Sequence, residues 1–584
     1  MNGRTDTNSA GNPIIGIDLG TSTSEIAVLK NGRPELLQDE QGERIISSVV
    51  QLAPDGQLLV GAAAKRGAIA YADRTALEVK RLMGTDAVVT LGERTFRPEE
   101  VSAMILRHLK SAAESKLGAN SVRDVVLSVP ARFDNPAREA TRRAAELAGL
   151  NVLRLINEPT AAALSYGLDR LRDEQKVLVF DFGGGTLDVT VLEMFEGVLD
   201  VKTSVGDDRL GGKDVDELLM GLFRRKFHEQ KGFELTPGRD LRADQTLKQE
   251  AEGYKRQLSS AYSVSVDIPY LSAQGGVSFT LTRGDFDGLI ADLLGRAMRL
   301  VDEALGRAKL TYADIGVILP VGGSSRIPAF RRELERRWGR SLQEYDNPDE
   351  AVARGAAIAA GIEKKEFAGE NDIMILDVTP HRLGVAVLEE VGDGQYIEDF
   401  FSEIIAKDAQ LPAIGTRDYA TLHDGQDSIN VRIFQATTDG NLCQDHRLIA
   451  EMPMENIPPA PAGQPIRIEF RYTADGTLDA RAHCLLAPDV TIDGRFSVVG
   501  RAAQGDDMAE RVQAAIDTLW QNSEDMKLCA PLLDQAEQVE RENPAAGPRV
   551  RAAADALRGA LAAGDKAAVQ TRFDVLTDLL FELS

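Results

Sequence analysis

The spacing of apolar residues along the chain falls into three patterns. Between Ile14 and about Gly361, short apolar runs alternate with segments of helical periodicity, a mixture that is typical of α/β architecture. Between Val378 and about Val499, apolar and polar residues alternate with a period of two, as they do in sheets with one buried face. From about Gly505 onward, apolar residues recur every three or four positions, and prolines interrupt the pattern. The sequence therefore predicts an α/β region, an all-β region and a small helical bundle, in that order.

A short apolar segment, Ile373–Leu376, follows a charged stretch with little periodicity. Linkers between domains are usually polar. An apolar linker therefore predicts a segment that docks on a neighbouring domain in at least one state, and an ordinary edge strand of the next domain is the alternative. The predicted units are residues 14–370 for the α/β domain, 371–380 for the linker, 381–502 for the β domain and 503–584 for the helices.

Composition and charge exclude several classes of protein. The 584 residues suffice for roughly three to five domains of about 100–200 residues each. A net charge of −24 argues against a nucleic-acid partner, because phosphate binding needs a basic surface. The three cysteines fit neither a metal motif nor a disulfide framework, and the sequence has no apolar run of about 18 residues that would predict a membrane span. Residues 1–13 are polar and lack an apolar signal core, so we expect a cytoplasmic protein without a membrane partner.

Two glycine-rich turns, at residues 15–22 and 179–188, look like copies of one device. In each, an apolar β-run leads into aspartate, glycine and threonine, and a second β-run follows. Such a hairpin tip lets backbone N–H groups approach an anion closely, and its aspartate can hold a hydrated Mg²⁺. One copy alone is better explained as a plain hairpin turn, but two copies that face each other would hold a triphosphate from both sides. The candidate residues are Asp18, Gly20, Thr21, Ser22, Asp181, Gly183, Gly184, Gly185, Thr186 and Asp188.

Other segments offer contacts to the rest of such a ligand. The Gly322–Arg326 turn follows a buried strand and precedes a helix, so a flat ring or a phosphate can lie against its backbone. Lys80 beside a phosphate pocket can stabilise the attacking water, and Glu158, at the start of a helix, can orient that water or Lys80. Each residue also has a plainer interpretation: Lys80 as a surface charge, and Glu158 as a carboxylate that interacts with the helix dipole.

These segments, taken in order, resemble the DnaK family of seventy-kilodalton heat-shock chaperones. Further matching segments are residues 129–131, 156–163, 347–351, 373–380 and 457–461. As an ordered set over nearly the whole chain, the motifs are far more specific than any one of them. The resemblance implies a multidomain fold: an actin-like α/β ATPase domain of two lobes, a β-sandwich substrate-binding domain and a short α-helical lid.

The resemblance also implies roles within an ATP site. The residues implied in catalysis are Lys80, Glu158, Asp18, Asp181 and Thr186. The first two would position the attacking water, and the two aspartates would hold Mg²⁺ through water, with Asp188 as a further support or a ligand of K⁺. The residues implied in binding ATP or ADP are Gly20, Thr21, Ser22, Gly183, Gly184, Gly185, Thr186, Glu252, Lys255, Arg256, Ser259, Gly322, Gly323, Ser324, Arg326 and Asp349. Arg256 on its own equally fits a solvated basic patch.

Two more sets of residues follow from the resemblance. The set implied in coupling the domains, and in receiving a J-domain co-chaperone, is Pro130, Arg138, Arg154, Asn157, Ile373, Met374, Ile375, Leu376 and Asp377. The set implied around a peptide cleft is Leu383, Leu388, Leu422, Ile429, Val431 and Ile433. Such a cleft takes an extended peptide through backbone hydrogen bonds and one apolar pocket. Ordinary sandwich core is the alternative interpretation for each member of the second set.

The implied function is that of an ATP-dependent bacterial chaperone. Slow ATP hydrolysis would control the binding and release of unfolded or extended apolar peptides, with stimulation by a J-domain co-chaperone. A small-molecule kinase or a filament protein on the same actin-like fold would leave the β domain, linker and helices unexplained. A dedicated regulator of one or a few client proteins remains open.

The chain departs from the family pattern in several places. The segment between Lys80 and Pro130 is short, and Arg132 stands where the family has tyrosine. The turn at Ala273–Gly276 is also short, which leaves the need for a nucleotide exchange factor open. A longer acidic loop is expected between Leu388 and Ile404, beside the cleft. The short first lobe and short lid are most similar to the HscC-like branch of the family.

Overall fold

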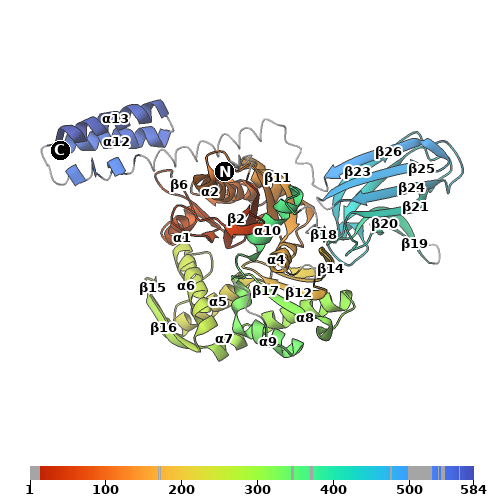
Figure 1. Cartoon of the computed structure of the whole chain (residues 1–584), viewed down its shortest axis with the longest axis horizontal. Coiled ribbons are helices and arrows are strands. Elements are labelled where there is room, and N and C mark those ends of the chain that lie inside the picture. Colours follow the sequence, from red (N-terminus) through yellow and green to blue (C-terminus); the bar gives the residue numbers. More distant parts are fainter. Residues whose placement is uncertain are drawn as a thin grey trace, which may run out of the picture.

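The computed structural model describes residues 13–168, 170, 173–342, 347–367, 373–392, 395–473 and 476–497. In the C-terminal region it describes residues 529, 531–533, 535–536, 538–540, 546–563 and 566–583. The expected start of the helical region at 503–528, the first two linker positions at 371–372 and Asp393 of the acidic segment lie outside these residues. Figure 1 shows the α/β domain in the centre, with the β domain beside it.

The first lobe of the α/β domain is built on a six-stranded sheet with the path β11-β10-β1-β2-β3, and β4 pairs with β2. Strands β1 and β2 form an antiparallel hairpin, β10 runs parallel to β1, and β11 runs parallel to β10. Helices α2 and α3 pack together and bury their apolar faces in the core of this lobe. The bounds are β1 Ile15–Leu19, β2 Thr23–Lys30, β3 Arg33–Leu36, β4 Ile46–Ser47, β10 Asp124–Val129, β11 Asn151–Asn157, α2 Pro98–Leu117 and α3 Asn135–Leu147.

The remaining elements of the first lobe are short and lie between β4 and α2. Strand β5 pairs with β6 and β7, and β8 pairs with β9. Their bounds are β5 Val49–Leu52, β6 Leu58–Val60, α1 Ala62–Gly67, β7 Thr75–Leu77, β8 Val89–Leu91 and β9 Arg94–Phe96.

The second lobe repeats the connectivity of the first. Its sheet has the order β17-β12-β13-β14-β18, with β12 antiparallel to β13 and parallel to β17, just as β1 is antiparallel to β2 and parallel to β10. Helices α5 to α9 and the β15–β16 hairpin complete this lobe around one large core. The bounds are β12 Gln175–Phe182, β13 Leu187–Phe195, β14 Val198–Asp207, α5 Gly212–Lys231, α6 Leu241–Ser260, β15 Ser263–Ser272, β16 Gly275–Thr282, α7 Arg283–Leu289, α8 Ala291–Arg307, β17 Val317–Val321 and α9 Pro328–Trp338.

Two small-residue helices, α4 (Glu158–Gly167) and α10 (Ala351–Glu363), pack against each other in the core between the two sheets. A Cβ atom on Gly355 of α10 would lie 1.7 Å from the carbonyl oxygen of Ala161 on α4. Glycine is therefore required where these two backbones meet. This close packing fixes the two sheets, and with them the two hairpin tips, relative to one another.

The apolar linker forms strand β18 (Met374–Leu376) at the edge of the second lobe's sheet. It runs parallel to β14, with Ile375 opposite Leu199. Ile373 is buried, Ile375 packs on the interlobe core, and Met374 is exposed. The linker therefore continues the α/β domain's sheet in this structure.

The β domain consists of two four-stranded antiparallel sheets, with the orders β20-β19-β22-β23 and β21-β24-β25-β26. Their inner faces share one apolar core, as the period-two pattern predicts. The bounds are β19 Leu383–Gly392, β20 Gln395–Ile405, β21 Ala413–Ala420, β22 Ile429–Gln435, β23 Arg447–Met454, β24 Pro465–Tyr472, β25 Thr477–Cys484 and β26 Ala487–Ser497.

The segment between Leu388 and Ile404 differs from its prediction. It is mostly the long β19–β20 hairpin, not an acidic loop. The acidic side chains of this segment, Glu389, Glu390, Glu398 and Asp399, are on its two strands, where exposed sites accommodate them. Because exposed positions of a two-stranded hairpin can carry charged side chains, the sequence of this hairpin looks like that of a polar loop.

The C-terminal helices α12 (Gly547–Ala563) and α13 (Lys566–Leu583) pack on each other. The stripe Val550, Ala554, Leu557 and Leu561 is buried in their small core, together with Leu576 and Leu580. The expected order of α/β, β and helical regions is confirmed. Within the described part of the chain, no helix has both the length and the apolarity that crossing a bilayer requires.

Candidate functional site: the cleft between the lobes

The tips of the two glycine-rich hairpins face each other across the cleft. A Cβ atom on Gly184 would lie 2.2 Å from Oγ of Ser22, and one on Gly185 would lie 2.7 Å from Oγ1 of Thr21. Only glycine lets the β12–β13 tip approach the β1–β2 tip this closely. The hydroxyls of Thr21, Ser22 and Thr186 and the backbone amides of both tips therefore surround one space.

The third glycine motif reaches the same space from the end of β17. Gly322 has φ of 76°, a left-handed conformation that favours glycine, and a Cβ there would lie 2.7 Å from the carbonyl oxygen of Phe182. Ser324 donates a hydrogen bond of 2.7 Å to the carbonyl oxygen of Gly183. A single cavity is lined by Asp18, Gly20, Thr21, Ser22, Glu25, Lys80, Glu158, Asp181, Gly183, Gly184, Gly185, Thr186, Gly322, Gly323 and Asp349.

Carboxylates lie at the base of this cavity. Oγ of Ser128 donates to Asp18 over 2.5 Å, whereas Oδ2 of Asp181 is buried and has no hydrogen-bond partner among the described residues. Burial, together with the charges of Glu158 and Asp188, raises the pKa of Asp181 well above its usual value. Burial likewise raises the pKa of Asp188 to about 6, against the opposing effect of Arg132. A cation bound here would offset the repulsion between these carboxylates.

The arrangement fits a hydrated Mg²⁺ better than a directly ligated metal. Among the described residues, no group of three or more histidine, cysteine, aspartate or glutamate side chains is arranged to hold a metal ion. The unpartnered oxygen of Asp181 can accept a hydrogen bond from a metal-bound water. Phosphate oxygens would supply the direct ligands, as is usual for Mg²⁺ in phosphate sites.

Lys80 and Glu158 form a buried ion pair beside the hairpin tips. Nζ of Lys80 donates to Oε1 of Glu158, and it lies 5.8 Å from the centre of the Phe133 ring. Burial opposes the charge of Lys80, but Glu158 and Asp18 outweigh burial and raise the pKa of Lys80. Burial raises the pKa of Glu158 to about 7, although Lys80 opposes this. The ammonium group is therefore charged and fixed at the edge of the cavity.

The predicted adenosine residues are less uniformly placed. Lys255 pairs with Asp216 over 2.8 Å and donates to the carbonyl oxygen of Gly212 over 3.0 Å. Arg326, which is about half exposed, pairs over 2.8 Å with Asp349, a residue of the cavity lining.

Glu252 of α6 is held between Lys65 and Arg256, at 2.9 and 2.8 Å, on another side of the cleft. The side chain of Arg256 is largely exposed, and Ser259 bonds to the carbonyl oxygen of Lys255. The structure thus brings Gly322, Gly323 and Asp349 to the same cavity as the hairpin tips, whereas Arg326 and the α6 residues are not among the residues that line it.

Comparison with a protein-family model decides the identity of this fold. The model described as Hsp70 protein matches residues 14–90 and 85–541, which is most of the chain. The chain belongs to the Hsp70 family. Hsp70 proteins are ATPases that bind ATP with Mg²⁺ and act as chaperones on peptide clients.

In this Hsp70 family member, a chain of hydrogen bonds joins the first lobe to the linker. Arg138 donates to Oδ1 of Asn157 over 2.6 Å, and Nδ2 of Asn157 donates to Oδ2 of Asp377 over 2.9 Å. Arg138 also donates to the carbonyl oxygens of Ala131 and Phe133, which follow Pro130. Arg154 donates to Glu363 over 3.2 Å, and its charge acts on the buried carboxyl of Asp377, where it opposes the rise in pKa that burial causes.

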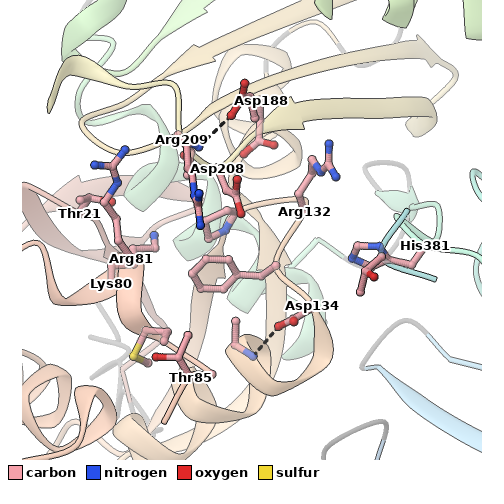
Figure 2. A pocket seen from close by; sticks show the side chains of 18 of the residues that line it. Thr21, Lys80, Arg81, Thr85, Arg132, Asp134, Asp188, Asp208, Arg209 and His381 are labelled. Carbon is pink, nitrogen blue, oxygen red and sulfur yellow. Dashed lines mark hydrogen bonds between the residues drawn. The ribbon is translucent and has the colours of Figure 1, made fainter. Parts of the chain in front are cut away.

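A second cavity, of about 840 Å³, lies where the cleft meets the β domain. Figure 2 shows Lys80 and Arg81 on one side of it, His381 on the other and Arg132 between them. Arg132 donates to the carbonyl oxygen of Gly206 over 2.6 Å. An ion pair between Arg447 of β23 and Asp134, the N-cap residue of α3, closes the far wall. The β domain therefore contacts the ATPase domain directly, beside the catalytic candidates.

The six predicted cleft residues separate into two groups. Leu383, Val431 and Ile433 are buried in the core of the sandwich, where their apolar side chains are explained by packing. Leu388 and Leu422 are exposed, at 37% and 53%, and Ile429 is partly buried. These three remain the residues that a peptide can reach.

Sequence reasoning missed several residues of the candidate site. Glu25 of β2 is buried, lines the cavity and interacts with Asp18, and burial raises its pKa well above the usual value. Its signal was a charged residue within a strand that is otherwise buried. Asp216, the partner of Lys255, and Glu78, which is described below, had no motif to mark them.

Proposed function

We propose that this chain couples slow ATP hydrolysis between the lobes to the binding and release of extended apolar peptides by the β domain. The observation that carries the proposal is the docked linker. Strand β18 extends the sheet of the ATPase domain, and the next residue, Asp377, is hydrogen-bonded to Asn157 and through it to Arg138. Arg138 also donates to the carbonyl oxygen of Phe133, whose ring centre lies 5.8 Å from Nζ of Lys80, and these contacts support coupling between the candidate phosphate site and the start of the β domain.

Hydrolysis in this proposal depends mainly on positioning and charge. The hairpin-tip amides and the hydroxyls of Thr21 and Thr186 bind the phosphates of ATP, and Glu158 holds Lys80 so that its ammonium group faces the attacking water. Mg²⁺, when bound, neutralises charge that develops on the phosphates. Asp18 and Asp181 hold its water shell, and Asp188 is proposed to support it or to bind K⁺.

The peptide site is proposed to lie at the loops beside β19 and β22. Leu388 and Leu422 would cover an extended peptide, and Ile429 would line its central pocket. The long β19–β20 hairpin stands next to Leu388 and adds acidic side chains there. This feature favours a second candidate function, that of a dedicated regulator with one or a few clients.

We further propose a place for the chain within the family. The short segment between Lys80 and Pro130 supports the HscC-like branch. A J-domain co-chaperone would approach Arg154, Asn157 and the linker. The composition supports a cytoplasmic location. The rate of nucleotide release, measured with and without an exchange factor, shows whether the chain requires one.

The test is single-turnover ATP hydrolysis, measured with and without an apolar peptide and a J-domain protein from the same organism. Stimulation by both additions is expected for a chaperone cycle coupled through the linker. A slow rate that neither addition changes contradicts the coupling. A survey of bound clients then separates a general chaperone, with many unrelated peptides, from a dedicated regulator.

A further inference from the structure

The segment Glu78–Arg81 of the first lobe touches the second lobe on both sides of Lys80. Glu78 precedes the 3₁₀ helix Val79–Leu82, and its carboxylate forms an ion pair with Lys248 of α6. Nζ of Lys213, on α5, lies 3.9 Å from the same oxygen. All three side chains are mostly shielded from solvent, with exposed fractions of 16%, 24% and 11%. This cluster is a contact between lobes and not a surface ion pair.

The residue after Lys80 makes a second contact between the lobes. Arg81 donates to the carbonyl oxygen of Gly185 over 3.1 Å, on the hairpin tip of the second lobe. It also pairs with Asp214 of α5 over 2.9 Å. Lys80, which itself pairs with Glu158, is therefore held between two anchors that both cross the cleft.

The backbone at Glu78 adds an independent observation. Its φ is 59°, in the left-handed region that residues with a Cβ rarely adopt. Strain of this kind persists where surrounding contacts determine it, often at functional sites. Here the conformation starts the 3₁₀ helix and leaves the Glu78 carboxylate facing α5 and α6.

The cluster pairs a negative charge on the first lobe, Glu78, with two positive charges on the second lobe, Lys248 and Lys213, and this attraction favours a closed cleft. Burial opposes a charge on Glu78, but Lys248 and Lys213 outweigh burial and lower the pKa of the Glu78 carboxyl. Glu78 is therefore a carboxylate at neutral pH. A neighbouring pair, Lys65 of α1 with Glu252 of α6, also crosses the cleft at 2.9 Å. Together they line a small cavity that reaches Thr21 and Ser22.

We propose that Glu78 is a positioning residue for ATP hydrolysis, which holds the lobes closed through Lys213 and Lys248 and thereby fixes Lys80 at the phosphate site. The proposal rests on the catalytic role proposed above for Lys80. It assigns to Glu78 two effects that belong together: faster hydrolysis of bound ATP and slower escape of the nucleotide. Substitution of a residue that only supports the fold would lower stability without changing both the hydrolysis rate and the rate of nucleotide release.

The test compares Glu78→Gln, Lys248→Met and the double variant in single-turnover hydrolysis and in release of a fluorescent ATP analogue. Each single variant is expected to lower the hydrolysis rate by about tenfold, since small misplacements of catalytic groups have large effects on rate. Each is also expected to speed nucleotide release. The double variant should resemble the single variants, because both remove one interaction. Glu78→Asp should recover part of the rate.

Controls separate this proposal from a loss of structure and from a failure of the Lys80 assignment. Glu35→Gln removes the 3.2 Å ion pair with Lys30, which lies within one lobe, and should leave both rates unchanged. Thermal unfolding of each variant shows whether it is folded. If Lys80→Ala slows hydrolysis but Glu78→Gln and Lys248→Met do not, the positioning role alone is wrong. If Lys80→Ala also hydrolyses ATP normally, both assignments fall.

Discussion

At the scale of single residues, Lys80 and Glu158 show how burial gives common side chains a specific role. Each is almost removed from solvent, and each is the other's ion-pair partner. Removal of one partner leaves a buried charge without compensation. The two residues are therefore candidates for catalysis, and each also needs the other for the stability of the folded domain.

Lys80→Ala and Thr186→Ala are expected to slow hydrolysis of bound ATP by about 100-fold or more, while ATP still binds through the backbone amides of the tips. Single-turnover hydrolysis and equilibrium binding measure the two properties separately. Thr186→Ser keeps the hydroxyl group and serves as the matched control. Normal turnover in both alanine variants would contradict the site.

His381 gives the docked arrangement a dependence on pH. Burial is the main reason that the pKa of His381 is lowered to about 3, and the nearby positive charges of Arg132, Arg138 and Lys407 lower it further. Undocking would remove the burial and the charges of Arg132 and Arg138 and return the pKa of His381 toward the ordinary histidine value of 6.5, so we expect the undocked state to take up a proton first as the pH falls. Docking is therefore strongest above pH 6.5 and weakens below it, by roughly 1 kcal/mol at pH 5.5 for a shift of this direction.

The measurement is the distance between fluorescent labels on the ATPase domain and the β domain, followed from pH 8 to pH 5. His381→Gln cannot gain the proton and should flatten this profile. An unchanged profile in the variant would assign the pH dependence to other groups.

The residues of the candidate phosphate site were predictable because chemistry restricts them. A hairpin tip that approaches an anion requires glycine, and Asp18-Leu19-Gly20 at the first tip has its counterpart in Asp181-Phe182-Gly183 at the second. Glu25 and Glu78 were not predictable, because their roles depend on partners such as Asp18 and Lys248 that the fold brings near them. A glutamate in isolation has the same sequence signal as a surface charge.

At the scale of elements, the linker strand β18 is the one whose position carries the proposed function. Its side chains alternate, with Ile375 packed on the core and Met374 exposed at 57%. Its backbone adds to β14 in parallel. Docking therefore combines apolar burial with backbone pairing.

Ile375→Asp is expected to release β18 from β14, because a carboxylate at a packed apolar position costs about 1–3 kcal/mol. ATP should then no longer accelerate the release of a bound peptide, which fluorescence anisotropy of a labelled peptide measures. Met374→Asp makes the same change on the exposed face and should retain the response. A normal ATP response in Ile375→Asp would refute the linker's role.

Strand periodicity predicted which residues of the β domain point inward, but not whether each one packs in the sandwich core or faces the predicted peptide cleft. Ile429, Val431 and Ile433 alternate on β22, yet only Ile429 near the strand's start remains partly accessible. A period of two identifies a face of a strand, and distance from the strand's end decides whether that face meets core or cleft. The β19–β20 hairpin was missed for a related reason, since its acidic positions hide its alternation.

At the scale of the whole molecule, the resemblance to the DnaK family, with which the repeated hairpins agree, correctly predicted a two-lobed domain followed by sheets and helices. The contact between domains was not predictable, because it rests on residues with no motif. Examples are the ion pair of Arg447 with Asp134, and the 3.4 Å contact of Arg307 with Asp408. Each is a partly exposed pair that contributes about 1 kcal/mol or less.

Reversal of one charge in this interface is expected to shift the docked population. Arg447→Glu sets a carboxylate beside Asp134, so we expect the two domains to separate more readily, as reported by the same pair of labels at pH 7.5. Arg495→Glu makes the same change at a pair with Asp479 inside the β domain and is the matched control. Asp134→Asn should partly restore docking in Arg447→Glu, because asparagine keeps the cap on α3. Unchanged docking in Arg447→Glu would remove this pair from the interface.

The pairing of β18 with β14 has a further consequence for the behaviour of the protein in a concentrated solution. Once β18 departs, the backbone of Val198–Asp200 becomes a bare sheet margin, and such margins recruit strands from other chains. Lys202, held by Asp200 and Glu193 at 2.6 and 3.1 Å, sets charges beside this margin and discourages stacking. Under the proposed coupling, each release of the linker would therefore expose this sheet edge to strands of other copies of the chain.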